Sequence, residues 1–166
     1  MFAKELLEAT DKLLLLCHKS GLRLATAESC TGGLIAGCMT EIPGASNVLE
    51  RGFITYSNKS KMALLGVSQA LLETDGAVSK EVANAMAEGA IEAADVDLSI
   101  AVTGVAGPGG DTKEKPVGLV HMAAAARGAL TLHERYYFKG DRAEVRMQAV
   151  HAAIALLAKQ AKTLAT

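Results

Sequence analysis

Residues 26–33 bring two nucleophilic side chains together with a pair of glycines. The segment reads TAESCTGG and has Ser29 and Cys30 at its centre. It follows apolar residues that predict a buried strand and precedes residues 34–39, which predict a helix. The first N–H groups of a helix are unpaired and partly positive, so they can hold a phosphate or the oxyanion of an acyl-transfer intermediate. The segment therefore indicates nucleophilic or anion-binding chemistry.

A serine nucleophile needs a base, and the local sequence around Ser29 offers no histidine. Tyr56 ends a predicted strand and Lys61 begins the next predicted helix, so both can face one pocket. A desolvated lysine, or a phenol beside a cation, can take the serine proton. His121, on a later predicted strand, is a further group that folding can bring near Ser29. Whether Tyr56 or Lys61 is the base stays open.

Cys30 is the competing nucleophile. A helix N-terminus lowers the pKa of a thiol and so favours the reactive thiolate. The alternative is that Cys30 is a small buried apolar residue. The sequence does not contain GxxxxGK[ST] or GxSxG, which separates it from P-loop proteins and from hydrolases with a nucleophile elbow.

A second candidate loop is rich in glycine and follows another predicted strand. Thr103 contributes a hydroxyl, and Gly104, Gly107 and Gly110 allow the backbone to approach a ligand closely. In open α/β sheets, ligands bind beyond the carboxyl ends of strands, where the strand order reverses. The alternative is that these glycines serve only tight turns.

Two charged residues are further candidates for holding a ligand. Glu28 can accept hydrogen bonds from a ligand or hold the turn. Arg142 begins the last predicted helix, where a guanidinium can bind phosphate, although an exposed arginine without a ligand is the simpler alternative. The four histidines show no metal-binding spacing, so no metal or cofactor is expected.

Composition favours a single globular domain over residues 1–166. A net charge of −1 and few aromatic residues (4%) do not suggest a nucleic-acid surface. The apolar runs are too short to span a membrane. Three cysteines without a CxxC pair, and no secretory signal, favour the cytoplasm.

The predicted elements alternate between helices and short strands. Helices are expected over 3–19, 34–41, 59–65, 68–73 and 141–164, with a longer one that starts at 79 and includes 93, and strands over 22–27, 52–56, 97–103, 117–125 and 130–138. Asp141 and Glu144 have the spacing of a capping box. The last helix is apolar on two faces, so it is either central or shared with another subunit. This pattern predicts a three-layer α/β/α fold with a mixed, mostly parallel sheet.

The motifs together resemble those of one family, the C-terminal domain of the competence/damage-inducible protein CinA. The matching segments occur in the order of the family and cover nearly the whole chain: TAESCTGG at 26–33, ERGFITYSN at 50–58, GAVS at 76–79, TGVAGP at 103–108 with Gly110, KPVG at 115–118 and FKGDR at 138–142. Longer family members carry an additional N-terminal domain, so the chain is expected to be a stand-alone form.

The resemblance implies a metal-independent nicotinamide mononucleotide deamidase of pyridine nucleotide salvage, forming nicotinic acid mononucleotide and ammonia. Together with the two apolar faces of the last helix, the resemblance predicts a homodimer or higher homo-oligomer. From the composition we expect a cytoplasmic protein with no cofactor and no membrane or nucleic-acid partner. The resemblance implies Ser29 as nucleophile, Tyr56 and Lys61 as its assistants, and Thr103, Gly104, Gly107, Gly110 and Arg142 as substrate-binding residues. To these the local sequence adds Cys30, Thr31 and Gly32 as the expected oxyanion turn and Glu28 as a candidate substrate-binding residue.

The name of the family supports an alternative from a different class. The chain would then be a non-catalytic nucleotide-sensing or interaction module linked to competence or DNA damage. No basic stripe or nucleic-acid recognition motif in the sequence accompanies that reading.

Overall fold

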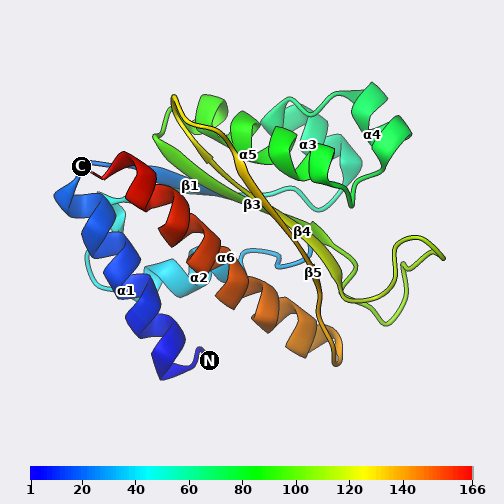
Figure 1. Cartoon of the computed structure of the whole chain (residues 1–166), viewed down its shortest axis with the longest axis horizontal. Helices are drawn as coiled ribbons and strands as arrows, with labels where there is room; N and C mark the ends of the chain where they lie inside the picture. The colour runs from blue at the N-terminus through cyan, green and yellow to red at the C-terminus, as the bar shows by residue number, and fades with distance from the viewer. Residues whose placement is uncertain (166) are drawn as a thin grey trace.

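A five-stranded sheet lies between two layers of helices in the computed structural model, which describes residues 1–165 (Figure 1). In chain order the elements are α1 (Lys4–Lys19), β1 (Leu24–Glu28), α2 (Leu34–Thr40), the short 3₁₀ helix Ala45–Asn47, β2 (Leu49–Ile54), α3 (Asn58–Leu65), α4 (Gln69–Asp75), α5 (Lys80–Ala94), β3 (Leu98–Gly104), β4 (Leu119–Ala126), β5 (Leu132–Tyr137) and α6 (Arg142–Leu164).

The strand order is β2-β1-β3-β4-β5. Strand β1 pairs in parallel with both β2 and β3, whereas β4 is antiparallel to β3 and to β5. All strands except β4 therefore run in one direction. The prediction of a three-layer α/β/α fold with a mixed, mostly parallel sheet is confirmed.

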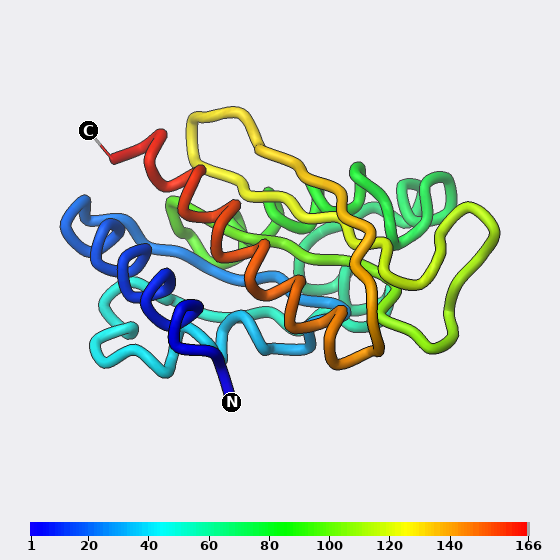
Figure 2. Tube along the Cα trace, turned by 60° about the horizontal axis from the view of Figure 1, so that its bottom comes forward, coloured from blue at the N-terminus to red at the C-terminus, as the bar shows by residue number. Residues whose placement is uncertain are grey.

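Each face of the sheet has its own apolar core. Helices α1, α2 and α6 bury one face, and α3, α4 and α5 bury the other. Because helices cover both faces, β1, β4 and most of β3 are buried along their lengths. In Figure 2 the blue α1 lies along the red and orange α6. Helix α6 is thus central, with the sheet on one side and α1 on another, which explains its two apolar faces.

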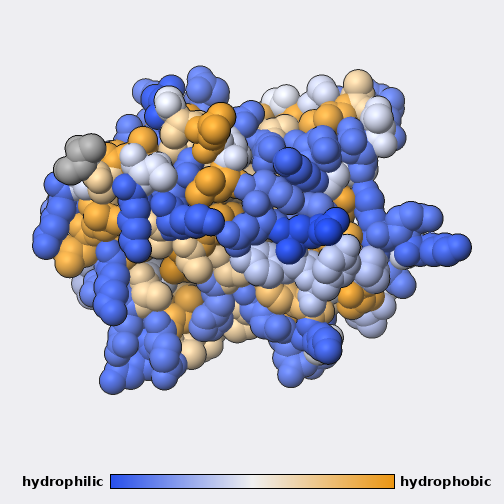
Figure 3. All heavy atoms as spheres, in the orientation of Figure 1, coloured by the Kyte–Doolittle hydropathy of each residue, from blue (hydrophilic) through white to orange (hydrophobic). Residues whose placement is uncertain are grey.

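Most predicted elements are present, and one of them is displaced. The expected strand over 52–56 lies at Leu49–Ile54, because pairing with β1 starts at Leu49 and ends where Ile54 meets Glu28. Tyr56 therefore follows the strand instead of ending it. The charged stretch at 111–115 belongs to an outer loop, which extends as a hydrophilic projection in Figure 3.

The strand order reverses between β1 and β3. The chain leaves β1 for β2 on one side, then crosses over β1 to form β3 on the other. Helix α2 follows β1 on one face, and α5 precedes β3 on the opposite face (Figure 1). The carboxyl ends of β1 and β3 are consequently adjacent at a switch point, where α/β proteins bind ligands. Within residues 1–165, no helix is long and apolar enough to cross a membrane.

Candidate active site

Ser29 lies directly beyond the carboxyl end of β1. Its backbone N–H donates to the Val102 carbonyl of β3 at 3.0 Å, and its own carbonyl accepts from the Gly32 N–H at 3.0 Å. Gly32 has a φ of +58°, a left-handed conformation that glycine adopts most readily. These contacts form a tight turn in which Ser29 is 9% exposed.

Glu28 anchors this turn through hydrogen bonds to the backbone at the start of helix α2. Its Oε2 accepts from the N–H groups of Gly33 and Ile35, both at 3.0 Å, and its Oε1 accepts from Ala36 N–H at 2.9 Å. Helix α2 begins only at Leu34. The expectation that the start of this helix is free to hold an anion is therefore wrong, because a buried carboxylate already occupies it. The geometry matches the turn-holding interpretation of Glu28, and its substrate-binding role stays a prediction.

Lys61 is the basic side chain that reaches Ser29. Its Nζ lies 3.1 Å from Ser29 Oγ and donates to the Thr55 carbonyl at 2.7 Å. The residue is only 1% exposed, and burial lowers the pKa of its amine below the usual 10.5. No carboxylate within residues 1–165 forms an ion pair with it. A buried lysine in this state is suited to accept the serine proton.

The local sequence explains why Lys61 points inward. Ser57 caps α3 by accepting from the Ser60 N–H, and the Ser60 hydroxyl pairs back with the Ser57 N–H, forming a capping box. Lys61 follows in the first turns of this helix and shares its buried side with Leu65. The cap therefore fixes the helix start from which Lys61 enters the site.

Cys30 is a poor competitor for the nucleophilic role. Burial raises the pKa of its thiol from 9.0 to about 11, with a lesser opposing contribution from its own backbone N–H. The thiol is therefore protonated at neutral pH, and the expected lowering of its pKa by a helix start is not found.

Tyr56 lies near the same site but contacts a different residue. The residue is 61% exposed, and its hydroxyl accepts from Arg142 Nη2 at 2.9 Å. Arg142 Nη1 donates to the Gly107 carbonyl at 2.9 Å. Arg142 thus joins Tyr56 to the glycine loop. Of the two proposed bases, Tyr56 and Lys61, only Lys61 is hydrogen-bonded to Ser29.

The glycine loop closes the other side of the site. The Thr103 hydroxyl donates to the Ala77 carbonyl at 2.8 Å. A Cβ on Gly104 would lie 2.8 Å from the Leu119 carbonyl oxygen, so only glycine fits there. Gly107 and Gly110 have φ values of +81° and +86°. The tight-turn interpretation of these glycines therefore holds, and they also line the cavity beside Ser29.

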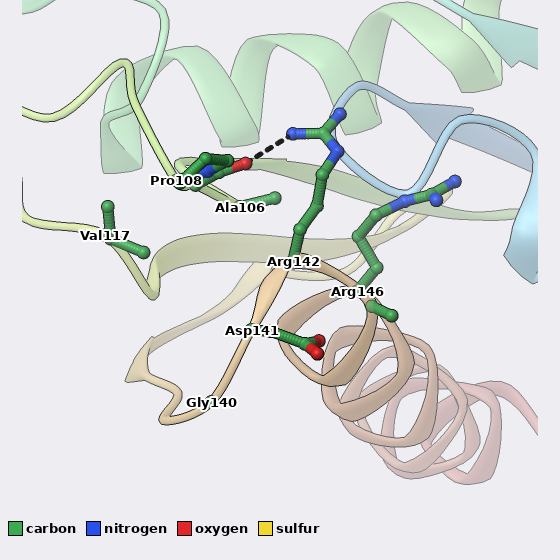
Figure 4. A pocket seen from close by; sticks show the side chains of 9 residues that line it. Ala106, Pro108, Val117, Gly140, Asp141, Arg142 and Arg146 are labelled. Atoms are coloured by element: carbon green, nitrogen blue, oxygen red, sulfur yellow. Dashed lines mark hydrogen bonds between the residues drawn. The ribbon is translucent and has the colours of Figure 1, made fainter.

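Two neighbouring cavities open at this place. The first, here called the serine cavity, has a volume of about 270 Å³ and is lined by Ser29, Cys30, Tyr56, Asn58, Lys61, Ala77, Val78, residues 103–107, Gly109, Gly110 and Arg142. The second, here called the helix cavity, has about 620 Å³ and is lined by residues 106–108, Val117, residues 140–143 and Arg146 (Figure 4). Ala106, Gly107 and Arg142 border both cavities, so the two lie side by side.

Arg146 is a site residue that the sequence analysis missed. Its Nε donates to the Cys30 carbonyl and its Nη2 to the Thr31 carbonyl, both at 3.0 Å. Figure 4 shows Arg142 and Arg146 extending in the same general direction from successive turns of α6. The four-residue spacing from Arg142 was the available signal, because such pairs share a helix face.

His121 is not part of this site. Its Nδ1 lies 2.9 Å from Nε2 of His133, and the two rings are stacked. It lines a cavity beyond the start of α5 rather than the serine cavity. Within residues 1–165 no three His, Cys, Asp or Glu side chains are grouped to hold a metal ion.

The fold and the site define a mixed α/β protein with a Ser–Lys pair at its switch point. The family model described as CinA C-terminal domain matches residues 6–161, and the chain belongs to this family. The expected resemblance is thereby confirmed.

Relatives with known sequences agree with this assignment. The chain is 51% identical over 146 residues to a CinA-like protein of Geobacter sp. (strain M21), covering 88% of the chain and 35% of that relative. It is 49% identical over 141 residues to a putative competence-damage inducible protein of Caldicellulosiruptor saccharolyticus, covering 85% and 34%. The chain thus spans about a third of the length of these relatives.

Solved structures show the same fold. Competence/damage inducible protein CihA from Agrobacterium tumefaciens is 46% identical, with a TM-score of 0.92 over 95% of this chain and 96% of that one. A CinA superfamily protein from Escherichia coli is 39% identical, with a TM-score of 0.89 over 95% and 92%. These names refer to competence and damage, and they name no reaction.

Proposed function

We propose that this domain hydrolyses the carboxamide of nicotinamide mononucleotide to nicotinic acid mononucleotide and ammonia, as a step of pyridine nucleotide salvage. The observation that carries the proposal is the buried Lys61 amine 3.1 Å from the Ser29 hydroxyl, beside a cavity that Arg142 borders. The pair supports acyl transfer, and the resemblance to the CinA family supports the choice of substrate.

The reaction begins with proton transfer from Ser29 to Lys61. Oγ attacks the carboxamide carbon while the neutral amine of Lys61 takes the hydroxyl proton. The resulting ammonium then gives a proton to the amide nitrogen, the C–N bond breaks, and ammonia leaves. A serine ester remains. Water attacks this ester with Lys61 again as base, and Ser29 is regenerated as the acid product leaves.

Backbone groups of the Ser29 turn stabilise the oxyanion that forms in each half-reaction. Within residues 1–165, the N–H groups of Cys30 and Thr31 donate to no other residue, whereas the Gly32 N–H is used inside the turn. The N–H that follows a serine nucleophile commonly serves as an oxyanion donor. One such donor contributes about 3–4 kcal/mol to transition-state stabilisation.

Arg142 is the group we assign to the substrate phosphate. A guanidinium has five N–H donors, and Arg142 uses two of them, toward Gly107 and Tyr56. It borders both cavities. The carboxamide would lie in the serine cavity at Ser29, and the ribose phosphate would extend past Arg142 toward the helix cavity. Tyr56 then holds the arginine in place.

The test is ammonia release from nicotinamide mononucleotide, with free nicotinamide as the control that lacks the phosphate. We expect turnover of the nucleotide, little or none of free nicotinamide, and no effect of a metal chelator. Binding of the nucleotide without release of ammonia, by calorimetry on the same preparation, would support the nucleotide-sensing alternative instead.

A further inference from the structure

We propose that Arg146 is a positioning residue that sets the orientation of the oxyanion-binding N–H groups beside Ser29; this inference rests on the proposed function. Its guanidinium holds two consecutive carbonyls of the turn, those of Cys30 and Thr31, at 3.0 Å each. Both carbonyls belong to the turn that carries the nucleophile, and Arg146 comes from α6, more than a hundred positions later in the chain.

Because the peptide bond is planar, these contacts also fix the directions of the N–H groups in the turn. In a trans peptide the C=O of one residue and the N–H of the next lie in one plane and point in opposite directions. The bond from Nε to the Cys30 carbonyl therefore fixes the direction of the Thr31 N–H. The bond from Nη2 to the Thr31 carbonyl likewise fixes the Gly32 N–H.

The third peptide plane is fixed through the second. The Gly32 N–H, held by Arg146 through the Thr31 carbonyl, donates to the Ser29 carbonyl at 3.0 Å. That carbonyl shares its plane with the Cys30 N–H, so the direction of this donor is set as well. All three peptide planes after Ser29 are thus held. Within residues 1–165, the N–H groups of the turn that donate to no other residue are those of Cys30 and Thr31.

The guanidinium also suits this place by charge and shape. A Cβ on Gly32 would lie 3.4 Å from Arg146 Nη2, so the side chain packs directly against the turn. Burial dominates the pKa of Cys30 and raises it, but the charge of Arg146 acts on that thiol in the lowering direction. A positive charge that reaches the turn favours an oxyanion there. Two carbonyls need a fork of two nitrogens, which arginine has and lysine does not.

Arg142 supplies a matched control from the same helix face. It lies one turn before Arg146, but its partners are the Gly107 carbonyl and the Tyr56 hydroxyl. It contacts the glycine loop and not the Ser29 turn. Loss of Arg142 should therefore raise KM, whereas loss of Arg146 should lower kcat.

The experiment measures ammonia release from nicotinamide mononucleotide by the wild-type chain, Arg146→Met, Arg146→Lys and Arg142→Met. We expect Arg146→Met to lose about 10²–10³-fold in kcat, the range for one oxyanion donor, with KM within threefold. Arg146→Lys should retain the charge but lose at least tenfold in kcat. Added guanidinium ion should restore part of the activity of Arg146→Met, which a general loss of packing would not allow.

Substrate affinity is measured separately in a Ser29→Ala background, by calorimetry. Adding Arg146→Met there should leave the dissociation constant within threefold. If Arg146→Met does not fold, Arg146→Lys is the variant that tests the inference. A wild-type kcat in Arg146→Lys overturns it. So does a kcat within threefold of wild type in Arg146→Met, or a loss of binding that matches the loss of kcat. A wild-type chain that releases no ammonia contradicts the proposed function itself, and the inference falls with it.

Discussion

Lys61 Nζ lies 3.1 Å from Ser29 Oγ, although 32 positions separate the two residues. The parallel pairing of β1 with β2 accounts for the approach. The chain leaves β1 at Ser29 and returns alongside it as β2, so that Thr55 follows Ile54 opposite Glu28 and donates its N–H to the Glu28 carbonyl at 2.9 Å. The capped helix α3 then turns Lys61 back toward the serine.

Replacing Lys61 separates its catalytic role from any structural one. Lys61→Met keeps a side chain of similar length and removes the base, so kcat should fall by about 10²–10⁴-fold. The melting temperature should change little, because removing the desolvation cost of the buried amine offsets the loss of its bond to the Thr55 carbonyl. Ammonia release and thermal unfolding measure the two effects. A large loss of stability in Lys61→Met would indicate that the lysine acts mainly as a structural anchor.

The pH profile should report the lowered pKa of Lys61. The neutral amine is the active form, and a lowered pKa raises its share at any given pH. Activity should therefore rise with pH, with a midpoint below 10.5, the usual lysine value. The quantity to measure is kcat/KM, which reflects the free enzyme. A midpoint at or above 10.5, or activity that falls across the neutral range as pH rises, is incompatible with this assignment.

Tyr56→Phe distinguishes the two proposed bases. The Tyr56 hydroxyl contacts Arg142 and not Ser29, so its removal should raise KM by up to about tenfold, the equivalent of one hydrogen bond of about 1.5 kcal/mol. The value of kcat should stay within threefold of wild type. A fall of 10³-fold in kcat at unchanged KM would instead make Tyr56 the base. Steady-state kinetics on the nucleotide provide both constants.

Glu28 should be required for stability. Glu28→Ala removes the acceptor of three backbone N–H groups, and hydrogen bonds to a charged group contribute about 1.5–3 kcal/mol each. We expect the free energy of unfolding, from urea titration, to fall by at least about 3 kcal/mol, and by less in Glu28→Gln. An unchanged stability together with a raised KM in Glu28→Gln would favour direct contact with the substrate.

Features coded by neighbouring residues could be predicted from the sequence. The start of α6 is one, since Asp141 and Glu144 form both bonds of the expected capping box. The alternation of helices with buried strands was sufficient for the layered fold. The end of β2 was misplaced because Thr55 and Tyr56 have strand-forming side chains, whereas the parallel pairing with β1 ends at Ile54. Local preference was overridden by tertiary pairing.

The sequence pointed to several residues that line the serine cavity, but it missed Arg146, and the roles of the others stay predictions. Ser29, Lys61 and Arg142 all lie around one cavity, as expected. Glu28 was ambiguous because its function depends on where α2 begins, five residues after Ser29. Arg146 was missed although it lies four residues after Arg142 on the same helix face, because its partners are backbone carbonyls, which every residue has and no motif marks.

The most direct test of Ser29 as the nucleophile compares two single substitutions, Ser29→Ala and Cys30→Ala, for ammonia release from nicotinamide mononucleotide. The two side chains are adjacent, and removing either leaves Lys61 in place. We predict that Ser29→Ala abolishes turnover while still binding the nucleotide, and that Cys30→Ala retains activity within about tenfold, since burial keeps the thiol protonated at neutral pH. Activity that survives in Ser29→Ala and disappears in Cys30→Ala would contradict the central claim.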